Sequence, residues 1–190
     1  MGVNLAAVLY PDADPDLAPE DVVRRLFPRM RLERTDRGSL ISHGFPERGE
    51  IAVGHITQGL IITTRDAALF RPTDLHARYA KLGETRILLT QQTAHDMFAF
   101  ARWSEGALVR ALSVNPVGKV WQSIGDPDPF EAPFWSGEHP VDTDYPLPFH
   151  PLEMAEAAVQ EFLGTQFEAS PTPQTVAPES IVLDRFARSA

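Results

Sequence analysis

The stretch MFAFARWSEGALVRALSVNPVGKVWQSI, residues 97–124, decides the fold of this chain. Three mostly apolar runs are separated by two short connections, residues 104–106 (SEG) and 115–118 (NPVG), which contain the residues that tight turns favour. The pattern predicts three consecutive antiparallel strands, a β-meander. Successive side chains alternate between the two faces of a strand, and in the first run both sets are apolar apart from Arg102. We therefore expect a sheet that is covered on both faces, except near Arg102.

Further elements are expected on both sides of this meander. Apolar runs bounded by turn-forming residues predict strands, and two of them joined by residues 57–59 (TQG) are typical of a β-hairpin. Helices are indicated where a proline or a capping residue opens an apolar stripe and a proline or glycine closes it. The expected strands are residues 3–10, 50–56, 60–65 and 85–91, and the expected helices are residues 19–28, 73–83 and 151–164.

These elements predict an α+β fold. It is a single domain with one mixed, mainly antiparallel sheet, about three helices and a strap rich in proline and aromatic residues. A chain of 190 residues with 43% hydrophobic content is long enough for one such core. We assign residues 1–169 to this domain and residues 170–190 to a linker-like C-terminal tail. The end of the tail, ESIVLDRFARSA, carries enough apolar side chains to dock as an edge strand.

Composition excludes several classes of function. The formal net charge is −9, and no block of Lys or Arg offers a surface for a nucleic-acid backbone. The absence of cysteine excludes disulfides, thiol catalysis and thiolate metal sites. No run approaches the roughly 20 apolar residues of a membrane span, and residues 1–16 lack the basic region of a secretory signal. We expect a soluble, cytoplasmic protein with no nucleic-acid or membrane partner.

Basic residues are densest between residues 24 and 37, where acidic residues interrupt them. Such a mixture indicates a solvated face held by ion pairs rather than an anion-binding surface. His43, His55 and His76 show no common spacing, so each is interpreted as an ordinary surface or core histidine.

The strap is the stretch FEAPFWSGEHPVDTDYPLPFHP, residues 130–151, between the meander and the last expected helix. Its prolines hold the backbone in extended conformations. Its aromatic side chains could line a pocket for a flat or apolar ligand, or could fill the core and offset the entropy of ordering an irregular segment. The second interpretation is favoured. The candidate binding residues are Phe134, Trp135, Tyr145 and Phe149.

No phosphate-binding loop, dinucleotide fingerprint, nucleophile elbow or zinc-protease motif occurs in the chain, and no cofactor is expected. His150 and Glu153 are three residues apart, as a metal pair on a helix would require. Their position at the start of a helix is explained equally by capping and by the helix dipole, so no metal site is assigned. The candidate catalytic residues, if there are any, are His139, His150, Glu131 and Glu138.

Two strings in the second half of the chain resemble a known family. They are IGDPDPFEAPFWSGEHPV (residues 124–141) and YPLPFHPLEMAEAAVQEFLG (residues 145–164). With MGVNLAAVLYPDAD, DAALFRPTDL and ARWSEGALVRALSVNP upstream, they resemble an uncharacterised family of small actinobacterial proteins with FE-P-(F/Y)-W-x-GEHP and PLPFHPLE signatures. The resemblance implies a bacterial, cytoplasmic setting and assigns no catalytic residue. Residues 91–97 (QQTAHDM) match the family only loosely.

The first functional hypothesis is a non-enzymatic binding or interaction domain that uses residues 130–149 to recognise a protein or a small molecule. It rests on the dense aromatic and proline content of the strap and on the missing catalytic motif. The alternative is a metal-dependent or hydrolase-like enzyme with a histidine and carboxylate site beneath the strap.

Overall fold

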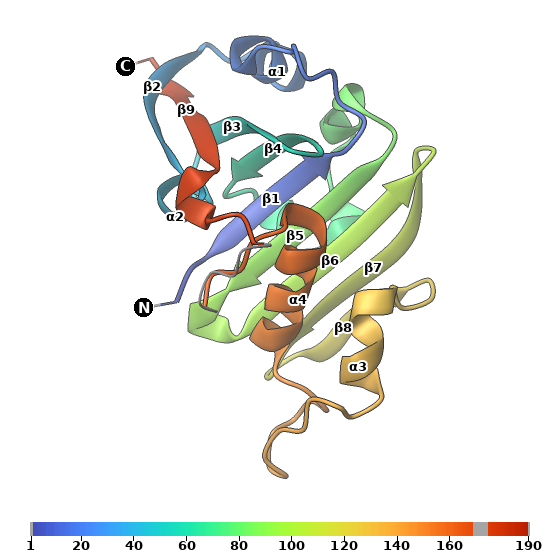
Figure 1. Ribbon diagram of the computed structural model, residues 1–190. Helices are drawn as coiled ribbons and strands as arrows, with labels where there is room; N and C mark the ends of the chain where they lie inside the picture. The colour runs from blue at the N-terminus through green and yellow to red at the C-terminus, as the bar shows by residue number, and fades with distance from the viewer. Residues whose placement is uncertain (1, 169–174, 190) are drawn as a thin grey trace.

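The computed structural model describes residues 2–168 and 175–189, which build one nine-stranded sheet with helical segments on both faces (Figure 1). The strands are β1 (Leu5–Tyr10), β2 (Leu32–Ser39), β3 (Ile51–Ile56), β4 (Gly59–Thr64), β5 (Arg86–Gln92), β6 (Met97–Ser104), β7 (Ala107–Asn115), β8 (Lys119–Ile124) and β9 (Val182–Arg188). The α-helices are α1 (Pro19–Leu26), α2 (Leu40–His43), α3 (Ala132–Trp135) and α4 (Pro151–Leu163). The 3-10 helices are η1 (Ala67–Phe70), η2 (Pro72–Asp74), η3 (Ala77–Leu82), η4 (Thr93–His95), η5 (Pro129–Glu131) and η6 (Pro178–Ser180).

The strand order is β2-β9-β3-β4-β1-β5-β6-β7-β8, and every neighbouring pair is antiparallel. The expected meander is confirmed as β6, β7 and β8. The prediction that the sheet is mixed, with some parallel strands, is wrong. A parallel pair needs a crossover connection between neighbouring strands, whereas α1 leads from the central β1 to β2 at the edge of the sheet.

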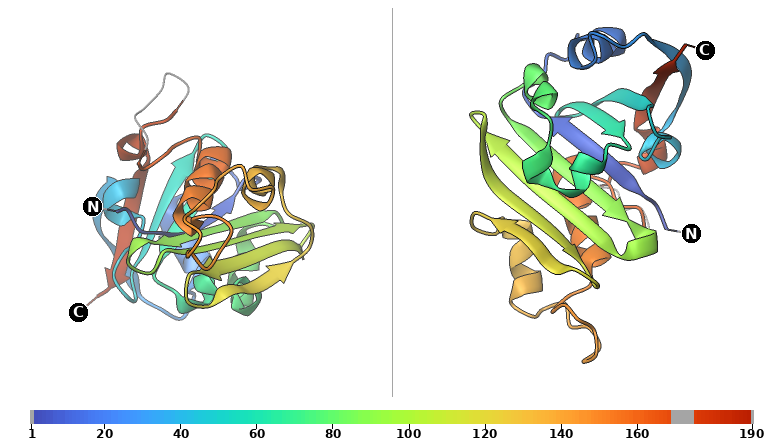
Figure 2. Two further views of the ribbon diagram at one scale, coloured as in Figure 1. Left: turned by 90° about the horizontal axis from the view of Figure 1, so that it is seen from below. Right: turned by 180° about the vertical axis from the view of Figure 1, so that it is seen from behind.

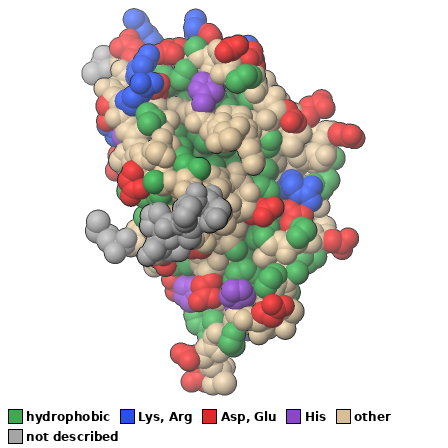
Figure 3. All heavy atoms as spheres, viewed as in Figure 1, with side chains coloured by type: hydrophobic (Ala, Val, Ile, Leu, Met, Phe, Trp, Pro, Cys, Tyr) green, Lys and Arg blue, Asp and Glu red, His purple; other side chains and the backbone are tan. Residues whose placement is uncertain are grey.

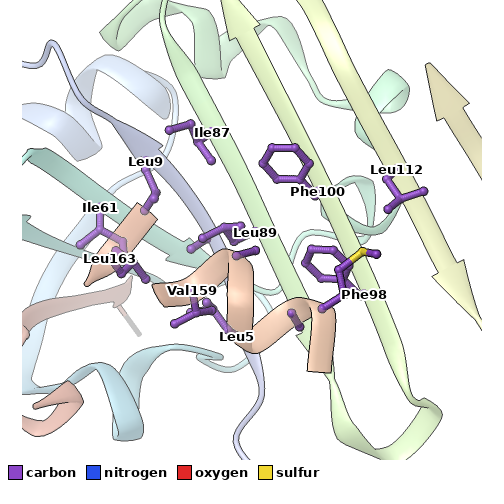
Figure 4. Packing of buried hydrophobic residues seen from close by; sticks show 14 of the residues in the cluster. Leu5, Leu9, Ile61, Ile87, Leu89, Phe98, Phe100, Leu112, Val159 and Leu163 are labelled. Carbon is purple, nitrogen blue, oxygen red and sulfur yellow. The ribbon is translucent and has the colours of Figure 1, made fainter. Parts of the chain in front are cut away.

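Different segments cover the two faces of the sheet. On one face, α4 and the strap pack over Phe98 and Phe100, as Figure 4 shows in part. On the other face, residues of α1, η1 and η3 pack with Met97 and Trp103 (Figure 2). The alternation expected for the first strand of the meander is therefore correct. Strand β1 is buried along its whole length because it lies in the middle of this doubly covered sheet.

Two of the three expected helices are confirmed, as α1 and α4. The helix expected at residues 73–83 is wrong, because this segment forms the short 3-10 helices η2 and η3. The side chain of His76 accepts a hydrogen bond from the backbone N–H of Arg78 at 2.9 Å. This bond caps the start of η3, and the non-helical backbone of Leu75 and His76, with ψ angles of 122° and 137°, interrupts the expected helix. The described residues also contain the single-turn helices α2 and α3, which the apolar pattern did not indicate.

The charged segment between residues 24 and 37 ends in an edge strand that the sequence pattern did not predict. Strand β2 has the sequence LERTDRGS. Apolar and polar residues do not alternate in it, so the pattern that identifies strands does not detect it. The expected ion pairs are present, since both Arg34 and Arg37 contact Asp184 of β9. A charged edge strand opposes pairing with other chains.

The C-terminal segment forms β9, and its expected place at the edge of the sheet is wrong. It lies between β2 and β3 and pairs with both, because β2 occupies the edge position outside it. The linker expected at residues 170–178 falls partly outside the described residues. The domain boundary at residue 169 stays a prediction.

Candidate functional site

Two arginine–carboxylate pairs fasten the start of the strap to the meander. Arg102 of β6 donates from Nε and Nη2 to the two carboxylate oxygens of Asp128, at 2.9 and 2.6 Å. Arg110 of β7 uses the same edge of its guanidinium on Glu131, with Nε 2.8 Å from Oε1. Bidentate pairs of this kind are among the strongest hydrogen-bonded contacts in proteins.

The sheet register explains why two carboxylates are needed at this point. Arg102 and Arg110 lie directly opposite each other on β6 and β7. Like charges in opposed positions destabilise a sheet, so Asp128 and Glu131 remove a repulsion as well as adding hydrogen bonds. The hydrogen bond with Asp128 raises the pKa of the Arg102 guanidinium above its ordinary value. The chain therefore enters the strap at a cluster of two arginines and two carboxylates that neutralise one another.

Glu131 is the most buried of the candidate catalytic residues. It is 0% exposed, and its partner Arg110 is 1% exposed. Oε1 also accepts from the backbone N–H of Asp128 at 3.0 Å, and Oε2 accepts from Nε1 of Trp135 at 3.2 Å. This carboxylate is the counter-ion of a buried guanidinium. These contacts give Glu131 a structural role.

The candidate binding residues divide into buried anchors and an exposed ring. Phe134 and Phe149 are buried, and their rings meet edge to face with 5.8 Å between centroids. Tyr145 is half-buried and stacks on His150 at 5.4 Å. Trp135 is 37% exposed, and its ring meets that of Phe149 edge to face at 4.8 Å. Of the four, Trp135 presents the largest ring to solvent.

The two histidines of the strap contact different carboxylates. His139 stacks on Phe134 at 4.1 Å, and its Nδ1 lies 3.6 Å from Oε2 of Glu153. His150 caps α4, because its Nδ1 accepts a hydrogen bond from a backbone N–H in the first turn of that helix at 3.4 Å. Its Nε2 lies 3.9 Å from Oδ2 of Asp96. The structure thus joins His139 to Glu153, rather than His150 as the sequence spacing suggested.

Glu138, the last candidate, lies in the turn after α3 and accepts a hydrogen bond from Oγ of Ser136 at 2.8 Å. Within residues 2–168 and 175–189, no group of three or more His, Cys, Asp or Glu side chains is placed to hold a metal ion. The strap residues therefore offer a surface of separate polar contacts built on a buried aromatic base.

The sequence indicates that this surface is negatively charged, although the net charge of the whole chain does not show where the charge lies. No lysine or arginine stands between Lys119 and Arg185, an interval that includes the strap and α4. In Figure 3, most Lys and Arg side chains lie at the upper end of the molecule among acidic ones, with a further group at mid-height on the right, and histidine and acidic side chains lie together at the lower end. Glu138 and Glu153 are both exposed. The strap face is therefore acidic.

A comparison of the sequence with models of protein families shows to which family the chain belongs. Residues 3–186 match a model described as a family of unknown function (DUF6928). The chain belongs to this family. The match confirms the resemblance to an uncharacterised family, and it includes the strap and all but the last two residues of β9. No curated protein and no solved structure matches the chain. Among the described residues, every helix is too short or too polar to cross a membrane.

Proposed function

We propose that this DUF6928 domain is a non-enzymatic binding domain whose strap face takes a basic segment of another protein. Trp135 is the observation that carries the proposal. A large aromatic ring that is exposed on a surface and fixed from below is the usual anchor of a protein interface. The strap supplies such a ring at the end of α3.

Trp135 is held in place from two sides. Its Nε1 donates to the buried carboxylate of Glu131 at 3.2 Å, and its ring is perpendicular to that of Phe149, which is 0% exposed. Glu131 is in turn fixed by Arg110. A side chain that is ordered before binding loses little entropy when a partner arrives, so Trp135 is suited to bind without rearrangement.

The charge around the strap selects the class of partner. Carboxylates at Glu138 and Glu153 are exposed, and the absence of Lys and Arg from 120 to 184 leaves them without competing cations from this part of the chain. An arginine or lysine side chain is attracted both to the face of a tryptophan ring and to such a negative surface. A basic segment therefore fits this face better than an acidic one.

The enzyme alternative has less support. Glu131 is bound to Arg110 in a closed site, and His139 and His150 contact different carboxylates. A catalytic base needs a free acceptor within reach of a substrate proton. The formal charge of −9 likewise opposes a nucleic-acid partner. We infer a bacterial, actinobacterial and cytoplasmic setting from the family resemblance alone.

Binding of a short arginine-rich peptide tests the proposal. We expect the dye-labelled peptide to bind the wild-type domain at physiological salt, and Trp135→Ala to weaken this binding about tenfold because the central ring is lost. Fluorescence anisotropy titration measures both affinities. The same peptide with citrulline in place of arginine keeps its shape but loses its charge, and it should bind much more weakly.

Trp121→Ala provides the matched control. Trp121 on β8 is 38% exposed, close to the 37% of Trp135, but lies outside the strap. General attraction between an acidic protein and a basic peptide would be equally strong in both variants. Equal affinities of Trp135→Ala and Trp121→Ala, or undiminished binding of the citrulline peptide, would refute the proposed site.

A further inference from the structure

Arg86 is a buried cation without a carboxylate partner among the described residues. It is 5% exposed, and its Nη1 donates to the carbonyl oxygen of Gly83 at 2.9 Å. Its Nε is buried and has no hydrogen-bond acceptor in the described part of the chain. A buried charge is costly unless it is paired. Arg110, which is also buried, meets this requirement through Glu131, and Arg86 does not.

The unused edge of Arg86 is the one that this protein uses for carboxylates elsewhere. Four other guanidinium groups donate from Nε and Nη2 to the two oxygens of one carboxylate. These pairs are Arg37 with Asp184, Arg102 with Asp128, Arg110 with Glu131 and Arg185 with Asp36. Nη1 of Arg86 is held by Gly83 and Nε is closed off from solvent, so Nη2 is the nitrogen that remains open to a carboxylate from outside the described residues.

The Arg86 side chain lines a pocket of about 320 Å³. The pocket is lined in part by residues of η2 and η3. These two segments pass over the face of the sheet opposite α4 (Figure 2). Leu75, Tyr79, Trp103 and Leu108 give it apolar walls, and Cζ of Arg86 lies 5.1 Å over the ring of Trp103. Its volume is at the small end of the range of ligand sites, roughly 300–1,000 Å³.

Two nearby groups bear on the charge of this pocket. His76 lines it, and because its Nδ1 accepts from the N–H of Arg78, the neutral imidazole carries its proton on Nε2 as a second donor. Glu84 acts on Arg86 through space without forming an ion pair in the described residues, and burial lowers the pKa of the Arg86 guanidinium. A bound anion would supply the counter-ion that the fold does not.

We propose that this pocket binds a small organic monocarboxylate. Its carboxylate accepts a hydrogen bond from Nη2 of Arg86, and its apolar part packs against Trp103 and Leu108. A single arginine in a small pocket with apolar walls beside it matches a monoanion that carries an apolar part. The formal charge of −9 on the chain opposes polyanions such as nucleotides. This site is separate from the strap, so each proposal can fail without the other.

Sodium benzoate is the first probe, with benzyl alcohol as its uncharged counterpart. Trp103 serves as the reporter because it lines the pocket beside Arg86. Replacing the two exposed tryptophans, Trp121→Phe and Trp135→Phe, leaves it as the only source of tryptophan fluorescence in the chain. We expect a saturable change in this fluorescence with benzoate and not with benzyl alcohol, together with a rise in melting temperature on binding.

Two variants separate a binding role from a structural one. Arg86→Met should weaken benzoate binding about 10- to 100-fold, since charge-assisted hydrogen bonds are lost, while the ligand-free melting temperature stays constant or rises because an unpaired buried charge is gone. Ala77→Phe, at an exposed position in the pocket wall, should block binding and keep Arg86 in place.

The outcomes are decisive in both directions. Saturable binding that both variants weaken supports the site. Absence of saturable binding by benzoate, acetate and phenylacetate overturns it, as does equal binding by Arg86→Met. A stronger response to inorganic phosphate than to benzoate would overturn the monocarboxylate assignment. A large fall in the stability of ligand-free Arg86→Met would show that Arg86 is a structural residue.

Discussion

Replacing Glu131 by alanine is expected to lower the free energy of unfolding by about 3–5 kcal/mol, because it leaves a buried guanidinium without its counter-ion. Arg110 is 1% exposed, and Glu131 is its only ion-pair partner among the described residues. The change also removes the acceptor for the backbone N–H of Asp128 and for Nε1 of Trp135. Urea denaturation followed by circular dichroism measures the loss.

Controls for this prediction come from the same network and from the same strap. Glu138→Ala removes an exposed carboxylate of the strap and should produce little change in stability. The double variant Arg110→Met with Glu131→Leu removes both charges and should recover most of the stability, because an apolar pair of similar volume has no unpaired ion. A loss below about 1 kcal/mol in Glu131→Ala would contradict the structural role assigned to this pair.

Replacing Phe149 by alanine should be similarly damaging, at about 3–5 kcal/mol. Phe149 is 0% exposed and joins the strap to the core, with Phe134 at 5.8 Å and Trp135 at 4.8 Å between ring centroids. Alanine leaves a cavity between the strap and the core and removes the support beneath Trp135. For a chain of this length we expect the melting temperature to fall by about 10 °C, which differential scanning calorimetry measures.

Phe149→Leu tests whether the loss follows from the cavity. Leucine fills much of the same volume and should cost only about 1 kcal/mol. In the binding experiment, Phe149→Leu should retain more peptide affinity than Trp135→Ala, since the exposed ring is still present. Equal stabilities of Phe149→Ala and Phe149→Leu would show that the ring is not packed as described.

The middle of the sheet was predictable because local patterns are sufficient there. Strands β1, β5, β6 and β7 are apolar runs bounded by turn residues, and their apolar side chains are needed on both faces. Helix α4 was predictable for a similar reason, since Pro151 starts it and Gly164 ends it with a left-handed φ of 65°. In each case the chemical reason lies within a few residues of the element.

The edge strand β2 and the segment at residues 73–83 were not predictable in the same way. Strand β2 has no apolar pattern and exists because β9 offers it hydrogen bonds and Asp184 offers a partner for Arg37. The segment at 73–83 has helical spacing, but the backbone of Leu75 and His76 is not helical and divides it into two short 3-10 helices. Contacts between distant residues decide the first case, and a local backbone break overrides the apolar pattern in the second.

The candidate site shows the same division. The aromatic and proline content identified residues 130–149 as the segment to study, but not which side chains face inward. Arg102 and Arg110 were not recognised as the residues that hold the strap, because their partners Asp128 and Glu131 lie 26 and 21 residues away and depend on the strand register. Arg86 appeared as one residue of an apolar strand, without any sign of its missing partner.

The sequence by itself determined the antiparallel meander, the buried central strands, the last helix, the acidic balance and the membership of an uncharacterised family. These properties depend on the composition and periodicity of contiguous residues. The tertiary structure alone decided that Glu131 is an internal counter-ion, that Trp135 is a supported surface ring, and that Arg86 faces a pocket without a carboxylate. A charge is neutralised or left unpaired by whatever folds against it, and that neighbour is chosen by strand order and register rather than by local sequence.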